Sequence, residues 1–473
     1  MTVDNPAAAL APAEIVPAVV PAQERAKVLT YMSGLILLMG LGVPYNGLIG
    51  LPITYFLKNR LHMDSHALAG FQVIAAIPLY VSFLFGFVRD RWSPFGRRDR
   101  GYMMLFGPVT AGLFVIMAFT PVTYVTLLAG MLLLTCAYLL VHSAQSGLAS
   151  ALGQQYAMSG QMSTVLNLII LIPAGLGFFL GGLLSNQLEG QNATVAARAL
   201  FLTGAAIMLA ITAFGFLKPR SVFAKLQDNA GPKINMLADL RRLVTWWPIY
   251  PPMLIWFVWS FSPGSGTVLQ YYLSDTLHAS DSQFGNWNAL FALAFLPMFI
   301  LYGFLCQKVS LRPLLWWGTI IGIPQMIPLI FVHTVTSAMW LAMPIGLMGG
   351  ICSAAYIDLL IRSCPPGLGG TVMTLSTTGY YIAVRFGDLL GTAVYQNYLT
   401  YLRPLTNIIG DGWLGGPLKN GHGGFVVCAI LTTLVYALII PLLLMTPKRL
   451  MATRDGQVEH EAALPATKGL EGG

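Results

Sequence analysis

Twelve long apolar runs constrain what this 473-residue chain can fold into. Each run is long enough to cross the roughly 30 Å hydrocarbon core of a bilayer as an α-helix. The runs are continuous rather than alternating, which excludes a transmembrane β-barrel. We therefore expect an all-α integral membrane protein with twelve transmembrane helices, near residues 29–57, 67–88, 102–119, 122–148, 161–185, 196–217, 247–273, 284–306, 313–333, 337–362, 371–397 and 422–446.

The composition agrees with a chain that spans a membrane many times. Charged residues make up only 9% of the chain, against about 25% in soluble domains. So little polar surface predicts a multi-pass protein, which we place in a bacterial inner (plasma) membrane with the lipid bilayer as its surroundings. The net charge of +8 is explained by lysine and arginine in cytoplasmic loops, so we expect no nucleic-acid partner.

One arginine-rich loop orients every span. Residues 89–100 hold five arginines, and each would cost roughly 2.5–3.5 kcal/mol in hydrocarbon. Short basic loops remain in the cytoplasm, which places both termini there as well. With this topology 20 of the 26 lysines and arginines are cytoplasmic, five lie outside, and Arg385 lies within a helix.

The chain divides into two halves that resemble each other. Residues 55–62 match residues 271–278, and Gly86-Phe87 matches Gly303-Phe304. A duplicated six-helix unit is typical of transporters whose cavity lies between two bundles; chance similarity of short apolar motifs is the alternative. We predict a disordered cytoplasmic tail (1–28), an N-terminal six-helix bundle (29–217), a cytoplasmic linker (218–246), a C-terminal six-helix bundle (247–446) and a second cytoplasmic tail (447–473).

Residues 86–98 have the form G-x3-D-R-x4-G-R-R. This pattern resembles the signature between helices 2 and 3 of the major facilitator superfamily. Its long Pro-Phe-Gly spacer is closer to the folate–biopterin transporter family within that superfamily, and three other stretches, 51–58, 261–273 and 364–371, are similar to the same family. The resemblance covers both halves. It implies alternating-access transport of a small folate-like or pterin-like solute, with protons as the coupling ion of a symporter.

One departure from the family pattern bears on the substrate. The family commonly carries a lysine in helix 2 where this chain has Ser82, and losing an intramembrane cation weakens the case for an anionic folate. Transport of sugars or cell-wall fragments is an alternative. A non-transporting membrane assembly factor or pigment-handling factor of the same fold is another.

The glycine and the acid of the signature suggest a conformational latch. Gly86 has no side chain, so another helix can approach it closely. The resemblance implies that Asp90 holds the cytoplasmic ends of helices 2 and 11 together, favoured by the dipole of helix 11. A loop that only sets topology is the alternative. We assign the latch to Gly86, Asp90, Arg91, Gly96, Arg97 and Arg98.

Charges inside the predicted spans are few and therefore informative. Arg385 lies near mid-bilayer, and Asp388 is on the same helical face. Asp358 and Arg362 lie four residues apart in helix 10. A functional interpretation gives Arg385 an anionic substrate group and gives Asp388, Asp358 or His142 the coupled proton. The alternatives are two self-neutralising ion pairs and a core histidine.

Two helices are interrupted at corresponding places in the two halves. Residues 42–47 and 262–266 are rich in glycine and proline, and such breaks point to binding sites and moving gates. Tyr380 and Tyr381 offer rings that could stack on a planar solute. No catalytic constellation, phosphate-binding loop or metal site is recognisable, so we expect neither an enzyme nor a cofactor. The candidate substrate-binding residues are Tyr45, Asn46, Gln72, Ser265, Gln270, Tyr380, Tyr381 and Arg385.

Overall fold

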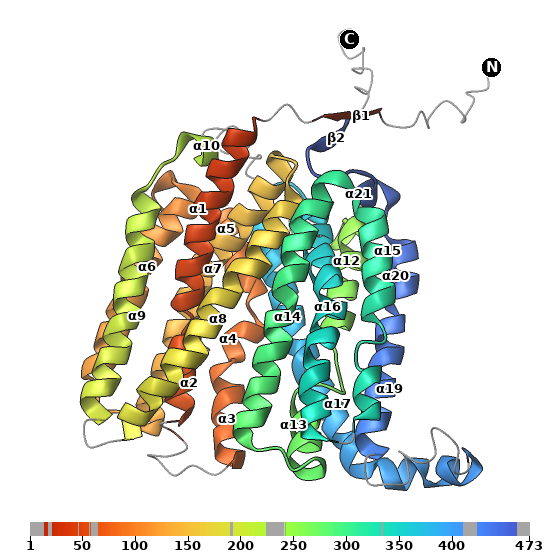
Figure 1. Cartoon of the computed structure of the whole chain (residues 1–473). Coiled ribbons are helices and arrows are strands. Elements are labelled where there is room, and N and C mark those ends of the chain that lie inside the picture. The colour runs from red at the N-terminus through yellow and green to blue at the C-terminus, as the bar shows by residue number, and fades with distance from the viewer. Residues whose placement is uncertain are drawn as a thin grey trace, which may run out of the picture.

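The chain, in a computed structural model, is a bundle of helices that run side by side, with a short pair of strands at one end (Figure 1). We call the end that carries the strands the terminal end and the opposite one the distal end. The structure describes residues 14–17, 21–45, 47–55, 57, 65–189, 193–223, 241, 243–332, 334–409 and 423–460.

The predicted first half begins with broken helices and continues with long ones. Its elements are α1 (Ala22–Leu41), α2 (Gly47–Tyr55), α3 (Ser65–Ala75), α4 (Ile77–Tyr80), α5 (Phe83–Arg91), η3 (Pro94–Gly96), α6 (Arg98–Phe119), α7 (Tyr124–Gln155), α8 (Ser159–Glu189) and α9 (Ala193–Phe216). The short helix α10 (Arg220–Phe223) follows, and residues 224–240 of the predicted linker lie outside the described part.

The predicted second half repeats this order, with a broken helix first. Its elements are η4 (Trp247–Ile249), α12 (Tyr250–Ser260), α13 (Thr267–Tyr271), η5 (Tyr272–Thr276), α14 (Asp281–Lys308), α15 (Leu311–Gly322), η6 (Ile327–Phe331), α16 (Val335–Ser363), α17 (Gly369–Ile409), α19 (Gly423–Ala437), α20 (Ile439–Met445) and α21 (Lys448–Ala452).

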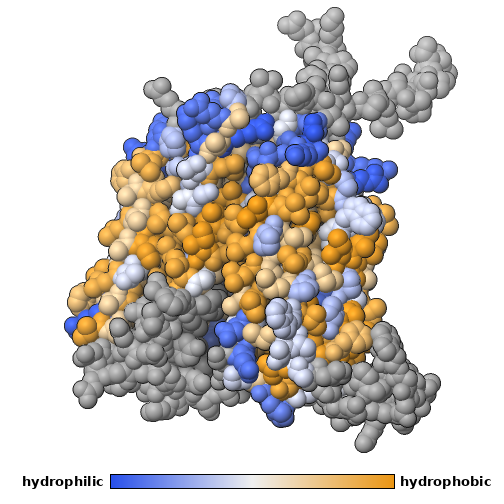
Figure 2. Space-filling view, in the orientation of Figure 1, coloured by the Kyte–Doolittle hydropathy of each residue, from blue (hydrophilic) through white to orange (hydrophobic). Residues whose placement is uncertain are grey.

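Eight helical segments in the described residues are long and apolar enough to cross a membrane. They coincide with eight of the predicted spans, which confirms an all-helical, multi-pass protein. The other four predicted spans contain the broken helices α1–α2, α3–α5 and α12–α13 and the 41-residue α17. The total of twelve spans stays a prediction. On the face that Figure 2 shows, apolar residues cover the middle of the bundle and hydrophilic residues gather toward the terminal end.

The two predicted helix breaks are present. Helix α1 ends at Leu41 and α2 begins at Gly47, while α12 ends at Ser260 and α13 begins at Thr267. Gly266 has φ of +59°, a conformation that glycine adopts at no steric cost. The second break is therefore built into the sequence at this position.

The chain ends differ from the predicted tails. Strand β1 (Glu14–Pro17) pairs antiparallel with β2 (Gln457–His460), and α1 begins at Ala22, before the predicted start near residue 29. Residues 448–460 likewise form α21 and β2 instead of a tail. The sequence showed no sign of these strands, because backbone pairing between the chain ends requires no apolar periodicity.

The apolar core shows where the halves meet. One cluster of buried side chains belongs mainly to the first half and two belong to the second half. The first-half cluster also includes Ile361, Cys364 and Val372 of the second half. These residues lie between the last turn of α16 and the first turn of α17. The halves therefore pack closely against each other at the terminal end.

Candidate functional site

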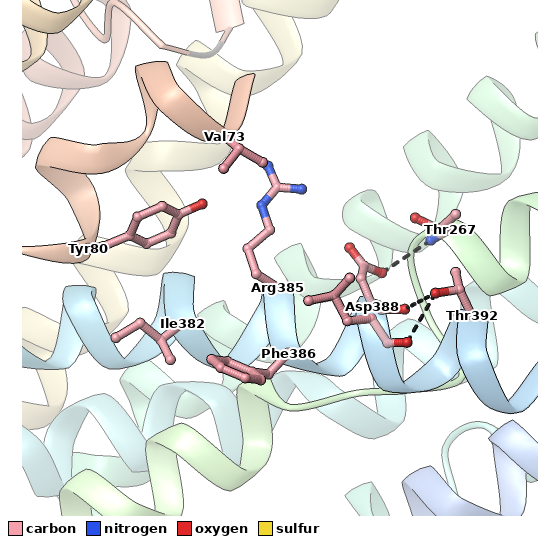
Figure 3. A pocket seen from close by; sticks show the side chains of 9 residues that line it. Val73, Tyr80, Thr267, Ile382, Arg385, Phe386, Asp388 and Thr392 are labelled. Carbon is pink, nitrogen blue, oxygen red and sulfur yellow. Dashed lines mark hydrogen bonds between the residues drawn. The ribbon is translucent and has the colours of Figure 1, made fainter. Parts of the chain in front are cut away.

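A cavity of about 440 Å³ lies where α3 and α4 of the first half face α13 and α17 of the second half. Most of its wall is apolar or aromatic, and two charged side chains enter it from α17 (Figure 3). The lining residues are Val73, Tyr80, Thr267, Ile382, Arg385, Phe386, Asp388, Leu389 and Thr392.

Arg385 is the cation of this cavity. Its guanidinium extends from α17 toward Val73 on the opposite helix (Figure 3). Within the described part of the chain, its side chain has no hydrogen-bond or ion-pair partner. Arg385 is exposed, and a charge within a membrane span is expensive unless water or a ligand meets it.

Asp388 ties the cavity to the break between α12 and α13. Its Oδ1 accepts a hydrogen bond of 3.3 Å from the backbone N–H of Thr267, the first residue of α13. A Cβ added at Gly266 would overlap the same oxygen, so the glycine lets the break approach the carboxylate. Arg385 and Asp388 form no ion pair with each other in the described structure, so the self-neutralising pair of the alternative is not formed.

Aromatic rings from both halves meet in the centre of the bundle. Tyr45 lies edge-on to Tyr138 and to Tyr381, with ring centroids 6.1 Å apart in each case. Tyr381 in turn lies 5.2 Å from Tyr380. These rings pack on one another and are not among those lining the cavity. The predicted stacking faces are thus used by protein rings in this conformation.

His142 belongs to the same aromatic group. Its ring stacks on Tyr138 with centroids 5.9 Å apart, and its buried Nδ1 has no partner among the described residues. It does not line the cavity. The role of His142 stays a prediction, because its buried Nδ1 lacks the hydrogen bond that a satisfied core histidine would make within the described residues.

Three other predicted substrate contacts do not line the cavity, and a fourth lies outside the described residues. Gln72 and Gln270 are exposed neighbours of its wall. The hydroxyl of Ser265 donates to the carbonyl of Ser262, 3.0 Å away, within its own turn. Asn46 lies outside the described residues.

Asp358 forms the ion pair that the alternative interpretation expected. Arg362 Nε donates to Asp358 Oδ1 at 2.7 Å, and the hydroxyl of Tyr302 donates to Asp358 Oδ2 at 2.7 Å. The carboxylate is fully buried and lies outside the cavity. Its contacts are those of a structural pair near the terminal end of α16.

Gly86 and Asp90 lie where α5 meets α17. Asp90 accepts hydrogen bonds from the backbone N–H groups of Gly370 (3.2 Å) and Thr371 (2.7 Å) and from the Thr371 hydroxyl (2.7 Å). A Cβ added at Gly86 would lie 2.5 Å from the carbonyl oxygen of Gly370 and would overlap the Thr374 hydroxyl. The carboxylate thus holds the free N–H groups at the start of α17, which also favour a negative charge.

Three further side chains of this contact, those of Arg89, Asp99 and Ser82, were not predicted. Arg89 donates to Asp90 (2.6 Å) and to Asp99 (2.6 Å), joining the latch acid to the start of α6. Ser82 is fully buried, and its hydroxyl donates to the carbonyl of Thr374, 2.9 Å away. Ser82 therefore belongs to the contact between the halves.

The remaining residues assigned to the latch lie on the surface. Gly96, Arg97 and Arg98 are exposed, and the exposed Arg91 has its guanidinium carbon 5.9 Å from the centroid of the Phe87 ring. Their charge fits the topological role of the loop.

Comparisons with known proteins agree with this architecture. A model of the BT1 family matches residues 42–463, and no curated protein matches. Solved structures match over most of their length at low identity. The proton:xylose symporter XylE, bound to 6-bromo-6-deoxy-D-glucose, has 13% identity and a TM-score of 0.61, with 89% of this chain and 96% of that chain covered.

Two further solved structures have similar scores. A bacterial homologue of the iron transporter ferroportin, in an outward-facing state, has 16% identity and a TM-score of 0.58, with 88% and 99% covered. The human organic anion transporter MFSD10 (TETRAN) has 16% identity and a TM-score of 0.56, with 90% and 100% covered. At these identities the likeness is one of fold, and XylE is a protein of the major facilitator superfamily.

Proposed function

The chain belongs to the BT1 family, and from that premise we propose that it is a secondary active transporter of a small organic anion that works by alternating access. The observation that carries the proposal is the cavity between the predicted halves, with Arg385 unpaired among the described residues. An anion that neutralises Arg385 would bind there and pass from one side to the other as the halves rock.

The walls of the cavity favour a solute with an apolar or aromatic body. Tyr80 and Phe386 flank Arg385 and could pack on a flat ring, while the guanidinium would hold a carboxylate in a bidentate pair. Folates, which join a pterin ring to carboxylates, fit this description and the family resemblance. A neutral sugar would leave Arg385 without a partner, so sugars and cell-wall fragments are less favoured.

We assign the coupled proton to Asp388 in preference to the other two candidates. It lines the cavity beside Arg385 and bonds the first residue of α13, so gaining a proton would weaken a contact at the helix break. Asp358 is committed to Arg362 and Tyr302, and His142 lies outside the cavity wall. Asp388 is therefore the carboxylate through which protonation could change both binding and helix geometry.

The arginine-rich loop supports a cytoplasmic location for the terminal end. In this orientation, Asp90 and Gly86 would close the cytoplasmic side by holding α5 against α17. The closed contact at that side leaves the cavity to be reached from outside. We place the protein in a bacterial inner membrane on the same charge asymmetry.

Uptake into proteoliposomes tests the transport proposal. Purified protein should accumulate labelled folate when the outside is acidified, and a protonophore should abolish the accumulation. Xylose, which carries no charge, serves as the matched control and should not accumulate. Failure to move any organic anion while the imposed gradient persists would contradict the proposal.

A further inference from the structure

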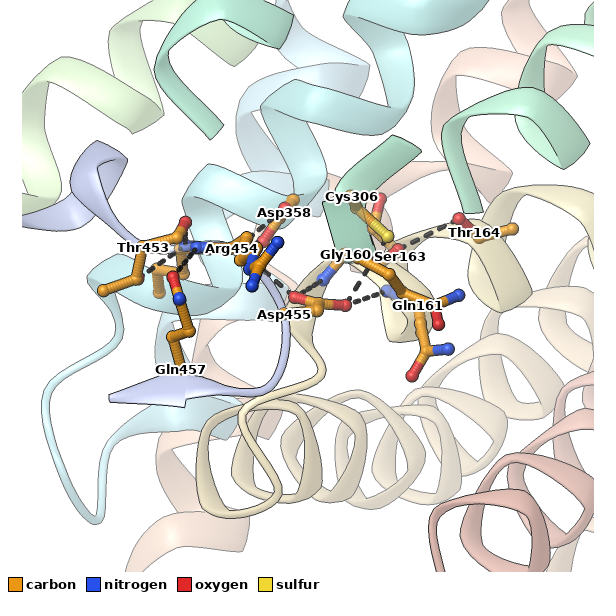
Figure 4. A network of polar contacts seen from close by, with 12 residues as sticks. Gly160, Gln161, Ser163, Thr164, Cys306, Asp358, Thr453, Arg454, Asp455 and Gln457 are labelled. Atoms are coloured by element: carbon orange, nitrogen blue, oxygen red, sulfur yellow. Dashed lines mark hydrogen bonds and ion pairs between the residues drawn. The ribbon is translucent and has the colours of Figure 1, made fainter. Parts of the chain in front are cut away.

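The segment that follows α21 enters the contact between the halves at the terminal end (Figure 4). Asp455 Oδ1 and Oδ2 accept hydrogen bonds from the backbone N–H groups of Gly160 (3.1 Å) and Gln161 (2.8 Å). The backbone N–H of Asp455 donates to the carbonyl of Cys306, 2.9 Å away. One buried residue near the end of the chain thus joins α8 of the first half to α14 of the second.

Arg362 fixes the same segment to α16. Its Nη1 donates to the Thr453 carbonyl at 2.7 Å, and its Nη2 lies 3.3 Å from Asp455 Oδ1. The N–H of Gly456 donates to the carbonyl of Ala157, 2.6 Å away, just before α8. Residues 453–456 are therefore bonded to both halves, and the halves cannot separate here without releasing them.

This arrangement repeats the contact made by Asp90. Asp90 accepts the N–H groups of Gly370 and Thr371 in the first turn of α17, as Asp455 accepts those in the first turn of α8. Each carboxylate also lies beside an arginine that contacts a second aspartate. Arg89 contacts Asp90 and Asp99. Arg362 in the second half contacts Asp455 and Asp358.

The duplicated glycines explain why the second acid comes from elsewhere. Gly303, the counterpart of Gly86, packs on α8, where an added Cβ would lie 3.0 Å from Thr164 Cγ2. Four residues after Gly86 is Asp90, but four after Gly303 is Gln307, whose amide donates back to the Gly303 carbonyl. The second half has the close helix contact without a carboxylate of its own.

We propose that residues 453–456 form a second latch, in which Asp455 replaces the acid missing from α14 and holds α8 against α14 and α16. The two latches close the terminal end on its two sides, and both must release before that end opens. This goes beyond the proposed transport function, and its test does not depend on any substrate.

Native cysteines allow the opening to be measured in the full chain. Cys306 touches Asp455, whereas Cys364 is buried against the first half at a different contact, where Gln154 donates to its carbonyl. Asp455→Ala leaves two N–H groups and one arm of Arg362 without their acceptor. We expect it to raise maleimide labelling of both cysteines at least about tenfold, as should truncation after Ala452.

The control variant is Asp275→Ala, which removes an exposed acid and should change neither rate. Cys352, fully buried inside the second half, reports general unfolding. The proposal is overturned if Asp455→Ala exposes Cys306 alone, because that is a local effect. It is equally overturned if Cys352 is labelled as fast as Cys364, because the segment would then be a purely structural brace.

The second latch should weaken as the pH rises. Asp455 faces Asp358 and Arg362 of α16 and Tyr302 and Cys306 of α14, while α8 presents backbone N–H groups. Burial, with a smaller contribution from Asp358, raises the pKa of Asp455 from 3.8 to about 7. A released, solvated Asp455 has its ordinary pKa, so closing takes up a proton between about pH 4 and pH 7.

Opening should therefore increase from pH 5 to pH 7 and level off near pH 8. The measurement is Cys364 labelling in the native chain divided by that in Asp455→Ala at each pH, because the ratio cancels the ionisation of the thiol itself. A ratio that stays level or falls over this range would show that Asp455 does not titrate with latch opening.

Discussion

Arg385→Ala is expected to reduce uptake of the anionic solute at least about 30-fold while leaving the protein folded. Losing one member of a desolvated charge pair costs about 2–5 kcal/mol, which corresponds to roughly 30-fold or more. The loss falls on the complex rather than on the free protein, because Arg385 has no partner among the described residues. Initial uptake rates at several solute concentrations, together with the melting temperature of the purified variant, measure both effects.

A matched variant separates the charge in the cavity from charge elsewhere on the protein. Arg198 in α9 lies over the ring of Phe119, with its guanidinium carbon 5.6 Å from the ring centroid, and does not line the cavity. Arg198→Ala should transport at close to the native rate. If Arg385→Ala instead transports normally but melts at a much lower temperature, Arg385 serves packing and the cavity is not its binding site.

Much of the fold follows from the sequence because membrane helices are local features. A run of about twenty apolar residues predicts a span without knowledge of its neighbours, and glycine-rich interruptions predict breaks, as at Gly266. Packing between helices is not local in this way. That Gly86 meets Gly370 and Thr374 depends on how two segments almost 300 residues apart are brought together, and only the family resemblance indicated that contact.

The candidate site was partly predictable, because charged side chains within predicted spans are costly and therefore rare. Arg385 and Asp388 could be selected on that ground, and the structure places both in one cavity. The tyrosines could not be assigned in the same way, because a ring that can stack on a ligand can equally stack on another ring. Asp455 was invisible for a different reason: it follows the last apolar run, where composition suggests only a tail.

Gly86→Ala should open the terminal end and depress transport, because its Cβ would meet the backbone of Gly370 as well as the Thr374 hydroxyl. The added carbon would lie 2.5 Å from the Gly370 carbonyl oxygen, so α5 and α17 must move apart. Overpacking of this kind typically costs about 1–3 kcal/mol, paid only when the latch of Asp90 is closed. The equilibrium should then shift about 5- to 150-fold toward the open terminal end.

Labelling of Cys364 measures this shift, and uptake measures its consequence. The matched variant is Gly303→Ala, whose Cβ would lie 3.0 Å from a methyl group of Thr164. A side chain can yield by a few tenths of an ångström where a backbone carbonyl cannot, so the Gly303 variant should show the smaller change in both assays. Equal effects of the two substitutions would mean that helix contacts in general, and not the Gly86–Asp90 latch, set the balance between the two ends of the transporter.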